Sequence, residues 1–399
     1  MRKLLLVLSL AVAAAASAET TLIRNVRVFD GTKMLAPRDV LVQDGKIAGI
    51  GKLTVSGATV VDGTGKTLLP GLIDSHTHTW GDALRTALAF GVTTELDMFT
   101  TVDFLKQTRA EQVAGTADGR ADLFSAGTLV TAPGGHGTEY GMTIPTITKP
   151  EEAQAFVDAR LAEGSDYIKI VVDDGKPYGL KFNTLDEPTL KAVVDAAHAR
   201  KKLAVVHVGS LADARMAIRA GADGLVHSFV DQQPDAAFGA DTAKRKMFVV
   251  PTLTVSLSVT GTGSGALTED KRIAPYLTTQ DTTQLKDAFT PRTKLDYTVA
   301  ENVVRQLRAA KVPILAGTDA GNPGTAHGSA LHRELELLVK AGLTPSEALA
   351  AATSAPAKAF RLADRGEIAI GKRADFVHLR LEEGIPIVST VWRQGRRVI

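Results

Sequence analysis

The sequence contains no cysteine among its 399 residues. No disulfide can therefore stabilise the fold, and no thiolate can bind a metal or attack a substrate. Any metal site must use His, Asp, Glu or Lys side chains. An excess of one charge is also absent, because 46 basic and 44 acidic residues give a net charge of +2. With only 5% aromatic residues and no Lys/Arg-rich run, the composition argues against nucleic-acid binding.

Long apolar runs are absent except at the N-terminus. Residues 4–16 form an apolar run that follows Arg2 and Lys3 and closes with Ala16-Ser17-Ala18. This pattern predicts a Sec-type signal peptide over residues 1–18, cleaved after Ala18, and a periplasmic or secreted protein. A membrane anchor is disfavoured because the run is shorter than the ~20 apolar residues of a spanning helix. The segment contains no arginine pair and no cysteine, so twin-arginine export and lipid attachment through a cysteine are disfavoured.

The rest of the chain changes character twice. Residues 19–68 and 358–399 contain short alternating strands punctuated by turns such as Asp30-Gly31 and Asp44-Gly45, which predicts one small β-sandwich domain built from both chain ends. Residues 69–357 alternate eight short apolar runs with helical patterns. The expected fold class is therefore α/β, a (β/α)₈ TIM barrel. A doubly wound sheet is the alternative, although no G-x-G-x-x-G follows the first run.

Two helices and one long connection stand out between the apolar runs. Thr148 precedes a helix that ends near Gly164, and Thr344-Pro345-Ser346-Glu347 has the spacing of a capping box. Residues 256–297 are rich in Gly, Thr and Ser. They are interpreted either as a disordered surface loop or as a lid over the barrel mouth.

Polar side chains follow the apolar runs at matching ends. The motif "GLIDSHTHTW" places two imidazoles on one face of the first predicted strand, and further groups end the fifth, sixth and eighth; they are His76, His78, His207, His227 and Asp319. Active sites of such barrels lie at these strand ends. Neutral imidazole and carboxylate are ligands that Zn²⁺, Mn²⁺ and Fe²⁺ accept. The clustering therefore predicts a metal site.

The fourth run, "YIKIVVDD", contains an unusual lysine. If Ile168 and Ile170 face the helices, Lys169 points into the barrel. A buried ammonium beside cations is strongly disfavoured, so Lys169 is expected to be neutralised, chemically changed, or paired with Asp173 or Asp319. Asp74 shares the strand face of His76, and we expect it either to orient a ligand histidine or to cap the strand end.

Together these features resemble the amidohydrolase superfamily, and within it the imidazolonepropionase-like and Xaa-Pro dipeptidase (prolidase)-like members. The resemblance rests on "PGLIDSHTH", Lys169, His207, His227, "AGTDAG" and the tail beginning "GLTPSEALAAATSAPAKAF". It runs from about Thr21 to the C-terminus. It implies a hydrolase acting on a carbon–nitrogen bond of a small-molecule substrate.

The resemblance also implies a two-metal centre, with Zn²⁺ as the expected ion. His76, His78 and Asp319 would bind one ion, His207 and His227 the other, and Lys169 would bridge both as N6-carboxylysine. A bridging hydroxide would attack the substrate, with Asp319 as general acid and base. A lactonase, esterase or phosphotriesterase acting through the same site, a mononuclear deaminase and a non-catalytic binding protein remain alternatives. The oligomeric state stays open, a homo-oligomer included.

The Gly-rich stretch "PGGHGTEYGM" resembles a substrate loop of the prolidase-like members, which makes His136 and Tyr140 the expected substrate-binding residues. The second and sixth runs, "GVTTELDMFT" and "LVHSFVD", depart from the family pattern, so a different substrate pocket is expected. Five other residues receive no assigned role: Trp80, His327 and His332 are left open, and His198 and His378 are interpreted as bystanders.

Overall fold

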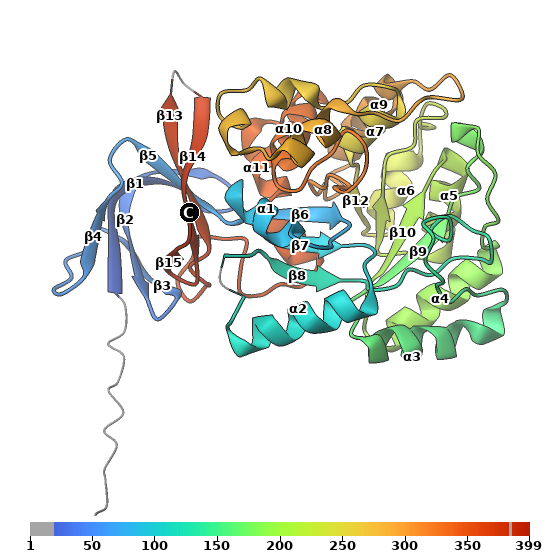
Figure 1. Cartoon of the computed structure of the whole chain (residues 1–399), viewed down its shortest axis with the longest axis horizontal. Coiled ribbons are helices and arrows are strands. Elements are labelled where there is room, and N and C mark those ends of the chain that lie inside the picture. The colour runs from blue at the N-terminus through green and yellow to red at the C-terminus, as the bar shows by residue number, and fades with distance from the viewer. Residues whose placement is uncertain (1–19, 118, 383–384) are drawn as a thin grey trace, which may run out of the picture.

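The computed structural model describes residues 20–117, 119–382 and 385–399. The predicted signal peptide, residues 1–18, lies outside the described residues. Figure 1 shows a β-rich part formed by the two ends of the chain, next to a larger part in which helices surround parallel strands. No helix in the described ranges is long and apolar enough to cross a bilayer.

The β-rich part is a single eight-stranded sheet with the order β15-β14-β13-β5-β1-β2-β3, in which β4 pairs with β1. Its strands are β1 (Thr20–Phe29), β2 (Met34–Gln43), β3 (Lys46–Gly51), β4 (Thr59–Asp62), β5 (Lys66–Pro70), β13 (Phe376–Glu382), β14 (Ile385–Arg393) and β15 (Arg396–Arg397). The chain ends meet where β5 and β13 pair antiparallel. The prediction that both ends build one β-rich unit is confirmed. The strands form one curved sheet rather than the expected sandwich of two sheets. This sheet has its own hydrophobic core, and Val28, Phe376 and Trp392 are among the core residues.

The larger part contains two parallel sheets. One has the order β6-β7-β8 and the other β12-β11-β10-β9. The strands are β6 (Leu72–Thr77), β7 (Val92–Asp97), β8 (Asp122–Ser125), β9 (Ile168–Val172), β10 (Ala204–Val208), β11 (Gly224–Val226) and β12 (Phe248–Val250). The predicted α/β class is therefore confirmed. The continuous eight-stranded ladder of the predicted barrel is not present, because the sheets connect only through isolated bridges such as Val130↔Ile170 and Val249↔Ile314.

The eighth predicted strand is one of two places where the ladder breaks; the other lies between β8 and β9. Leu315 N–H donates to Val249 O at 2.9 Å and Ser75 N–H donates to Ala316 O at 2.9 Å, so this run lies between β12 and β6. Asp319 then adopts φ +59°, which ends the extended conformation. Gly317 permits the close approach, since a Cβ there would lie 2.8 Å from the backbone nitrogen of His76.

The helices cover the outer faces of the parallel strands (Figure 1). They are α1 (Ala83–Ala89), α2 (Val102–Ala114), α3 (Ala153–Glu163), α4 (Glu187–Ala199), α5 (Leu211–Ala220), α6 (Phe238–Lys244), α7 (Leu253–Val259), α8 (Thr279–Lys286), α9 (Tyr297–Ala309), α10 (Ser329–Lys340), α11 (Pro345–Ala351) and α12 (Ser354–Ala359). The predicted capping box at Thr344 and Glu347 begins α11, and Gly164 ends α3 in a left-handed conformation as expected.

Alternating strand residues divide the core in two. Ile168, Ile170 and Val172 belong to the main cluster packed against the helices. Tyr167 and Val205 belong to a second cluster enclosed by the strands. Because side chains alternate along a strand, Lys169 shares the enclosed side with Tyr167. The predicted inward direction of Lys169 is therefore confirmed, although it is the second residue of β9 rather than its last.

The predicted loop over residues 256–297 contains regular structure. It includes the end of α7, two short 3₁₀ turns and α8, and Thr278 and Asp281 form a capping box at the start of α8. Residues Phe289, Arg292 and Leu295 line the large cavity described below. The segment therefore forms part of the cavity wall, and the lid interpretation stays a prediction.

Candidate metal centre

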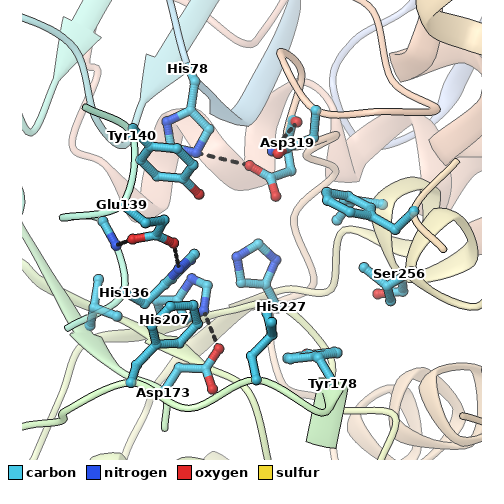
Figure 2. A pocket seen from close by; sticks show the side chains of 18 of the residues that line it. His78, His136, Glu139, Tyr140, Asp173, Tyr178, His207, His227, Ser256 and Asp319 are labelled. Carbon is cyan, nitrogen blue, oxygen red and sulfur yellow. Dashed lines mark hydrogen bonds and ion pairs between the residues drawn. The ribbon is translucent and has the colours of Figure 1, made fainter. Parts of the chain in front are cut away.

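The predicted site residues converge on one cavity of about 610 Å³ at the carboxyl ends of the parallel strands (Figure 2). Its walls include five of the six predicted metal-binding residues: His78, Lys169, His207, His227 and Asp319. The sixth, His76, is fully buried beside them. Its ring centroid lies 5.4 Å from that of His78 and 4.7 Å from that of His227, and the rings of His207 and His227 lie 4.4 Å apart.

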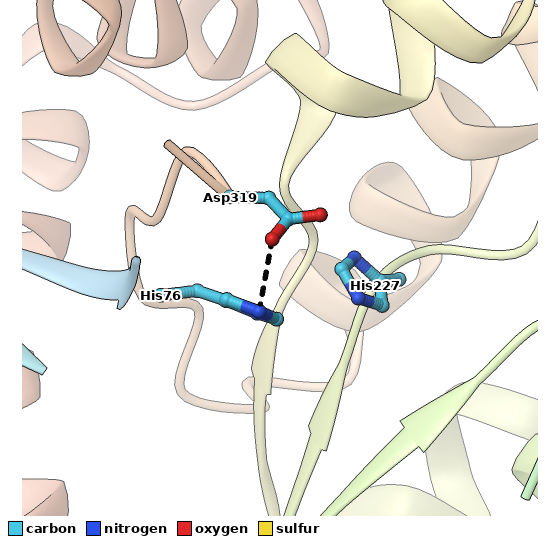
Figure 3. Close-up of side chains that lie close together, drawn as sticks. All are labelled: His76, His227 and Asp319. Carbon is cyan, nitrogen blue, oxygen red and sulfur yellow. Dashed lines mark ion pairs between the residues drawn. The ribbon is translucent and has the colours of Figure 1, made fainter. Parts of the chain in front are cut away.

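Three of these residues are close enough to share one ion. Ligand atoms of His76, His227 and Asp319 all lie within 4.8 Å of one another (Figure 3). The resemblance assigns His76 and Asp319 to one ion and His227 to the other, so these three residues come from both expected ligand sets. Asp319 Oδ1 lies 3.2 Å from His76 Nε2 and 3.0 Å from His78 Nε2. One carboxylate oxygen thus contacts both imidazoles of the H-x-H motif.

Several of these polar atoms are buried without a hydrogen-bond partner in the described part of the chain. They are both ring nitrogens of His76 and Oδ1 of Asp319, whose short approach is not aligned as a hydrogen bond. Buried polar atoms are normally satisfied, and exceptions require an explanation such as an ion. Imidazole nitrogen and carboxylate oxygen are the donor types of divalent transition-metal sites. The residues present therefore fit a metal ion.

Neighbouring groups fix the orientation of the other three histidines. His78 Nδ1 lies 3.2 Å from the carbonyl oxygen of Phe99. His227 Nδ1 lies 2.7 Å from Thr252 Oγ1, and His207 Nε2 lies 3.3 Å from Asp173 Oδ2. Each contact engages one ring nitrogen and leaves the other for a ligand. Such partners fix the tautomer and ring orientation of metal-binding histidines.

The backbone at the site adopts conformations that non-glycine residues rarely take. The φ angles are +76° at His227, +47° at Thr252 and +59° at Asp319. Positive φ costs free energy for residues with a Cβ and tends to cluster at functional sites. At all three positions the unusual φ lies at the carboxyl end of a strand or apolar run. The strain is consistent with selection for side-chain placement.

Electrostatics favour the protonation states that a metal requires. Burial, reinforced by Lys169, lowers the pKa of His76 to about 3, so its imidazole is neutral. Burial opposes ionisation of Asp319, but His76 and His78 hold its pKa well below the usual range. Neutral imidazoles beside an ionised carboxylate are ready to accept a cation without losing protons.

Lys169 is 2% exposed, and its Nζ makes no hydrogen bond or ion pair with any residue that the structure describes. Neither of the alternative partners forms a close ion pair with Lys169 among the described residues: Asp173 contacts His207, and Asp319 contacts the H-x-H pair. Burial lowers the pKa of Lys169 to about 8, although Asp319 and Asp97 favour the charged form. A substantial neutral fraction near pH 8 leaves the amine nitrogen free to react.

Asp74 lies within β6, and its carboxyl group contacts backbone and hydroxyl donors rather than a ligand ring. Its Oδ1 accepts hydrogen bonds from the backbone N–H of His76 at 3.2 Å and of Thr318 at 3.1 Å. Its Oδ2 accepts one from Thr318 Oγ1 at 2.7 Å. The carboxyl group therefore ties β6 to the turn that presents Asp319.

The predicted substrate residues also reach the cavity. His136 and Tyr140 line it, and His136 Nδ1 lies 2.5 Å from Glu139 Oε1. The His136 ring centroid is 4.9 Å from that of His207. The Gly-rich loop after β8 therefore extends to the metal-binding histidines (Figure 2).

The remaining histidines lie away from the cavity walls. His327 Nδ1 contacts Glu95 Oε1 at 2.9 Å, and His332, on α10, contacts the carbonyl oxygen of Phe90 at 2.9 Å. His198 pairs with Asp223 on the outside of α4, and His378 is buried in β13. The bystander interpretation of His198 and His378 agrees with these positions.

Sequence reasoning missed the support behind His227. Thr252 occupies the N-cap position of α7 but makes no side-chain cap, because its hydroxyl contacts His227. The carboxylate of Glu334, on α10, caps the N-terminus of α7 instead. Its Oε1 accepts a hydrogen bond from Leu253 N at 3.0 Å. Its Oε2 accepts hydrogen bonds from Thr254 N at 2.8 Å and from Thr254 Oγ1 at 2.7 Å. Burial raises the pKa of Glu334 to about 7, although these donors favour its ionised form. No local pattern connects residues about 80 positions apart.

Glu334→Gln is expected to lower the free energy of unfolding by about 1–3 kcal/mol, because the amide leaves buried donors unsatisfied. Displacing Thr252 should also weaken metal binding roughly 10- to 100-fold, as for other partners of ligand histidines. Denaturant unfolding and metal titration measure both effects. Glu336→Gln on the same helix, where the carboxylate is 39% exposed, is the matched control. Equal metal affinity in the two variants would contradict the proposed support.

Comparison with known proteins agrees with this geometry. The model of the "Amidohydrolase family" matches residues 67–398. An imidazolonepropionase of Streptomyces griseus subsp. griseus is 39% identical over 104 residues, which cover 24% of this chain and 26% of that protein. The chain thus matches only about a quarter of the length of this curated relative.

Solved structures share the fold over almost the whole chain. A Xaa-Pro dipeptidase with bound methionine in its active site superposes with a TM-score of 0.76 at 21% identity, covering 95% of this chain and 99% of that one. A putative prolidase from Bifidobacterium longum gives a TM-score of 0.75 at 24% identity, covering 95% and 94%. The family match extends from β5 through every predicted metal-binding residue to the C-terminal strands, and the chain belongs to the amidohydrolase family.

Proposed function

We propose that the chain is an exported, binuclear metal-dependent hydrolase that cleaves an amide or peptide C–N bond of a small molecule. The observation that carries the proposal is the convergence of the strand-end histidines, Asp319 and a buried Lys169 on one cavity, where Lys169 has no ion-pair partner among the described residues. Membership of the amidohydrolase family supports it, as does the likeness to proteins named imidazolonepropionase and Xaa-Pro dipeptidase.

The proposal includes the finer architecture. The two parallel sheets and the 313–319 run act as one (β/α)₈ barrel over residues 69–357, with the β-rich domain formed by residues 19–68 and 358–399. The hydrogen bonds from this run to β12 and β6 support that arrangement. They place Asp319 beside His76 and His78 although these residues are far apart in sequence.

In the proposed centre, His76, His78 and Asp319 would hold one ion, His207 and His227 would hold the other, and a carboxylated Lys169 would supply oxygen ligands. Two divalent cations, with Zn²⁺ the expected ion, would supply an activated water and polarise the scissile carbonyl. The Asp319 carboxylate would accept a proton from the attacking water and deliver it to the leaving nitrogen. Phe99, Thr252 and Asp173 hold the imidazole rings in place during these transfers.

The cavity walls indicate a substrate with a substantial apolar group. Leu129, Val171, Phe182 and Phe289 line the space next to the centre. These side chains exclude water from the reacting atoms, which strengthens electrostatic interactions there. Arg292 lies at the exposed rim of the same cavity and makes no ion pair with any described residue, so an anionic group of the substrate can be accommodated there.

The alternatives share parts of this site. An ester, lactone or phosphotriester would use the same centre, so only reactivity distinguishes it. A mononuclear deaminase is disfavoured because it gives no role to a buried Lys169 without a partner. A non-catalytic binding protein is disfavoured because every predicted metal-binding residue is in place around the cavity.

A substrate panel tests the proposal. Zinc-loaded protein lacking residues 1–18 is expected to hydrolyse members of a set of N-acyl amino acids and dipeptides, releasing a free amine that is quantified directly. Matched lactones, carboxylic esters and a phosphotriester form the second arm, and ammonia release from aminated heterocycles the third. Turnover confined to the second or third arm would overturn the amidohydrolase proposal. N-terminal sequencing of the exported protein tests cleavage after Ala18.

A further inference from the structure

A second cavity of about 280 Å³ lies against the metal centre on the side of the H-x-H motif. Its walls include His78, Trp80, Phe99, Tyr140 and Met142. Four of its lining residues, His78, Phe99, Tyr140 and Asn322, also line the large cavity, so these side chains lie between the two spaces. A group bound in the second cavity would therefore lie next to the same reacting atoms as a group bound in the first.

Aromatic rings define the shape of this second cavity. The indole of Trp80 lies nearly parallel to the imidazole of His78, with ring centroids 6.3 Å apart and an interplanar angle of 17°. Phe99 stands almost perpendicular to Trp80, at 6.2 Å and 84°. The ring of Tyr140 lies 6.4 Å from that of Phe99. In a chain with only 5% aromatic residues, this concentration of rings at one cavity is unusual.

Trp80 is 42% exposed, whereas the chain's other tryptophan, Trp392, is 6% exposed in the β-rich sheet. Trp80 has ring contacts with His78 and Phe99 and none with the β-rich core among the described residues. It therefore does not pack beneath that sheet. A partly exposed aromatic ring in a concave site is typical of a surface that binds an apolar ligand.

Size and chemistry point to the occupant. A cavity of roughly 150 Å³ can hold benzene, so 280 Å³ accommodates a planar aromatic group with its linking atoms. Trp80 and Phe99 offer a ring face and a ring edge, which match the offset-stacked and edge-to-face arrangements that aromatic pairs prefer. Met142 adds a flexible thioether that adapts to different ring shapes. The base of the cavity includes Asn322, whose Nδ2 donates to the carbonyl oxygen of Asp319 at 3.1 Å.

We propose that the Trp80 cavity is a substrate subsite that binds a planar aromatic group attached on one side of the scissile amide, while the large cavity holds the group on the other side. This inference rests on the proposed amidohydrolase function, because that function places a scissile bond beside His78. It adds a substrate class: amides that carry an aromatic ring directly beside the bond to be cleaved.

Fluorescence of a single tryptophan tests the subsite. In a Trp392→Phe background, Trp80 is the only tryptophan of the chain, so its emission reports on this cavity. Zinc-loaded protein is titrated with benzamide and with cyclohexanecarboxamide, which are similar in size but differ in having an aromatic face. Benzamide is expected to change the Trp80 emission and to bind about 2- to 12-fold more tightly, which corresponds to the usual strength of an aromatic pair.

Calorimetric titration of the two amides against wild-type and variant chains provides a readout that does not depend on the Trp392→Phe background. Trp80→Leu is expected to abolish the preference for benzamide. Tyr276→Leu, which alters a ring that is 55% exposed and outside both cavities, is expected to keep it. Equal affinities for the two amides in the wild-type chain, or an unchanged preference in Trp80→Leu, would overturn the subsite.

The subsite and the proposed function can fail separately. A preference that depends on Trp80 in a chain that hydrolyses no amide would support the subsite and contradict the function. Amide hydrolysis with no aromatic preference would support the function and overturn the subsite.

Discussion

Lys169→Ala is expected to lower kcat/KM by about 10³-fold, which corresponds to roughly 4 kcal/mol of lost transition-state stabilisation by the metal centre. Lys169 is buried, and its Nζ contacts no charged partner in the described chain. An ammonium there would repel two cations. A carbamate removes the conflict: the neutral amine attacks the carbon of CO₂, a C–N bond forms as one C=O π bond opens, and one proton is released, which leaves one negative charge shared by two oxygens.

The lowered pKa of Lys169, about 8, provides neutral amine for that reaction at mildly alkaline pH. Intact-protein mass spectrometry under native conditions should therefore show an increment of one CO₂ in the wild-type chain and none in Lys169→Ala. Short-chain carboxylates, added at high concentration, should restore part of the activity by filling the space with an anion. Lys191→Ala, at an exposed ion pair on α4, is the matched control and should retain full activity. Full activity in Lys169→Ala would exclude the bridging role.

Asp319→Asn is expected to reduce kcat by roughly 10²- to 10⁴-fold, the usual contribution of a general acid and base. The substitution preserves size and removes the proton acceptor. Asparagine also tolerates positive φ better than most residues, which suits the φ of +59° at this position. The loss can therefore be attributed to the carboxylate rather than to a rearranged backbone.

Rates for this variant must be measured at saturating Zn²⁺, because removing a charged ligand also weakens metal binding. Asp195→Asn, an exposed carboxylate on α4 that is 59% exposed, controls for loss of one negative charge. If Asp319→Asn kept more than a tenth of the wild-type kcat with metal bound, another residue would have to move the proton.

The sequence predicted the residues of the site better than their surroundings. His76, His78, His207 and His227 could be located because each follows a short apolar run, and parallel strands bring their carboxyl ends together. The inward direction of Lys169 followed from strict alternation in "YIKIVVDD". These patterns are local in the sequence. They predict the structure well here because parallel strands are buried on both faces.

The supporting contacts could not be predicted because they are not local. Glu334 caps α7 from another helix, and Asp173 reaches His207 from the neighbouring strand. The break in the eighth run depends on the φ of Asp319, which no propensity encodes. One signal was present but unused: Thr278 and Asp281 have capping-box spacing, and they marked a helix within the segment interpreted as a loop or lid.

The central claim is a centre that binds two metal ions. The most direct measurement is the metal content of the purified protein lacking residues 1–18, determined by elemental analysis after saturation with Zn²⁺ and bicarbonate and removal of unbound ions. The account predicts two divalent ions per chain in the wild type and fewer in Lys169→Ala. One ion or none per wild-type chain after saturation would contradict it.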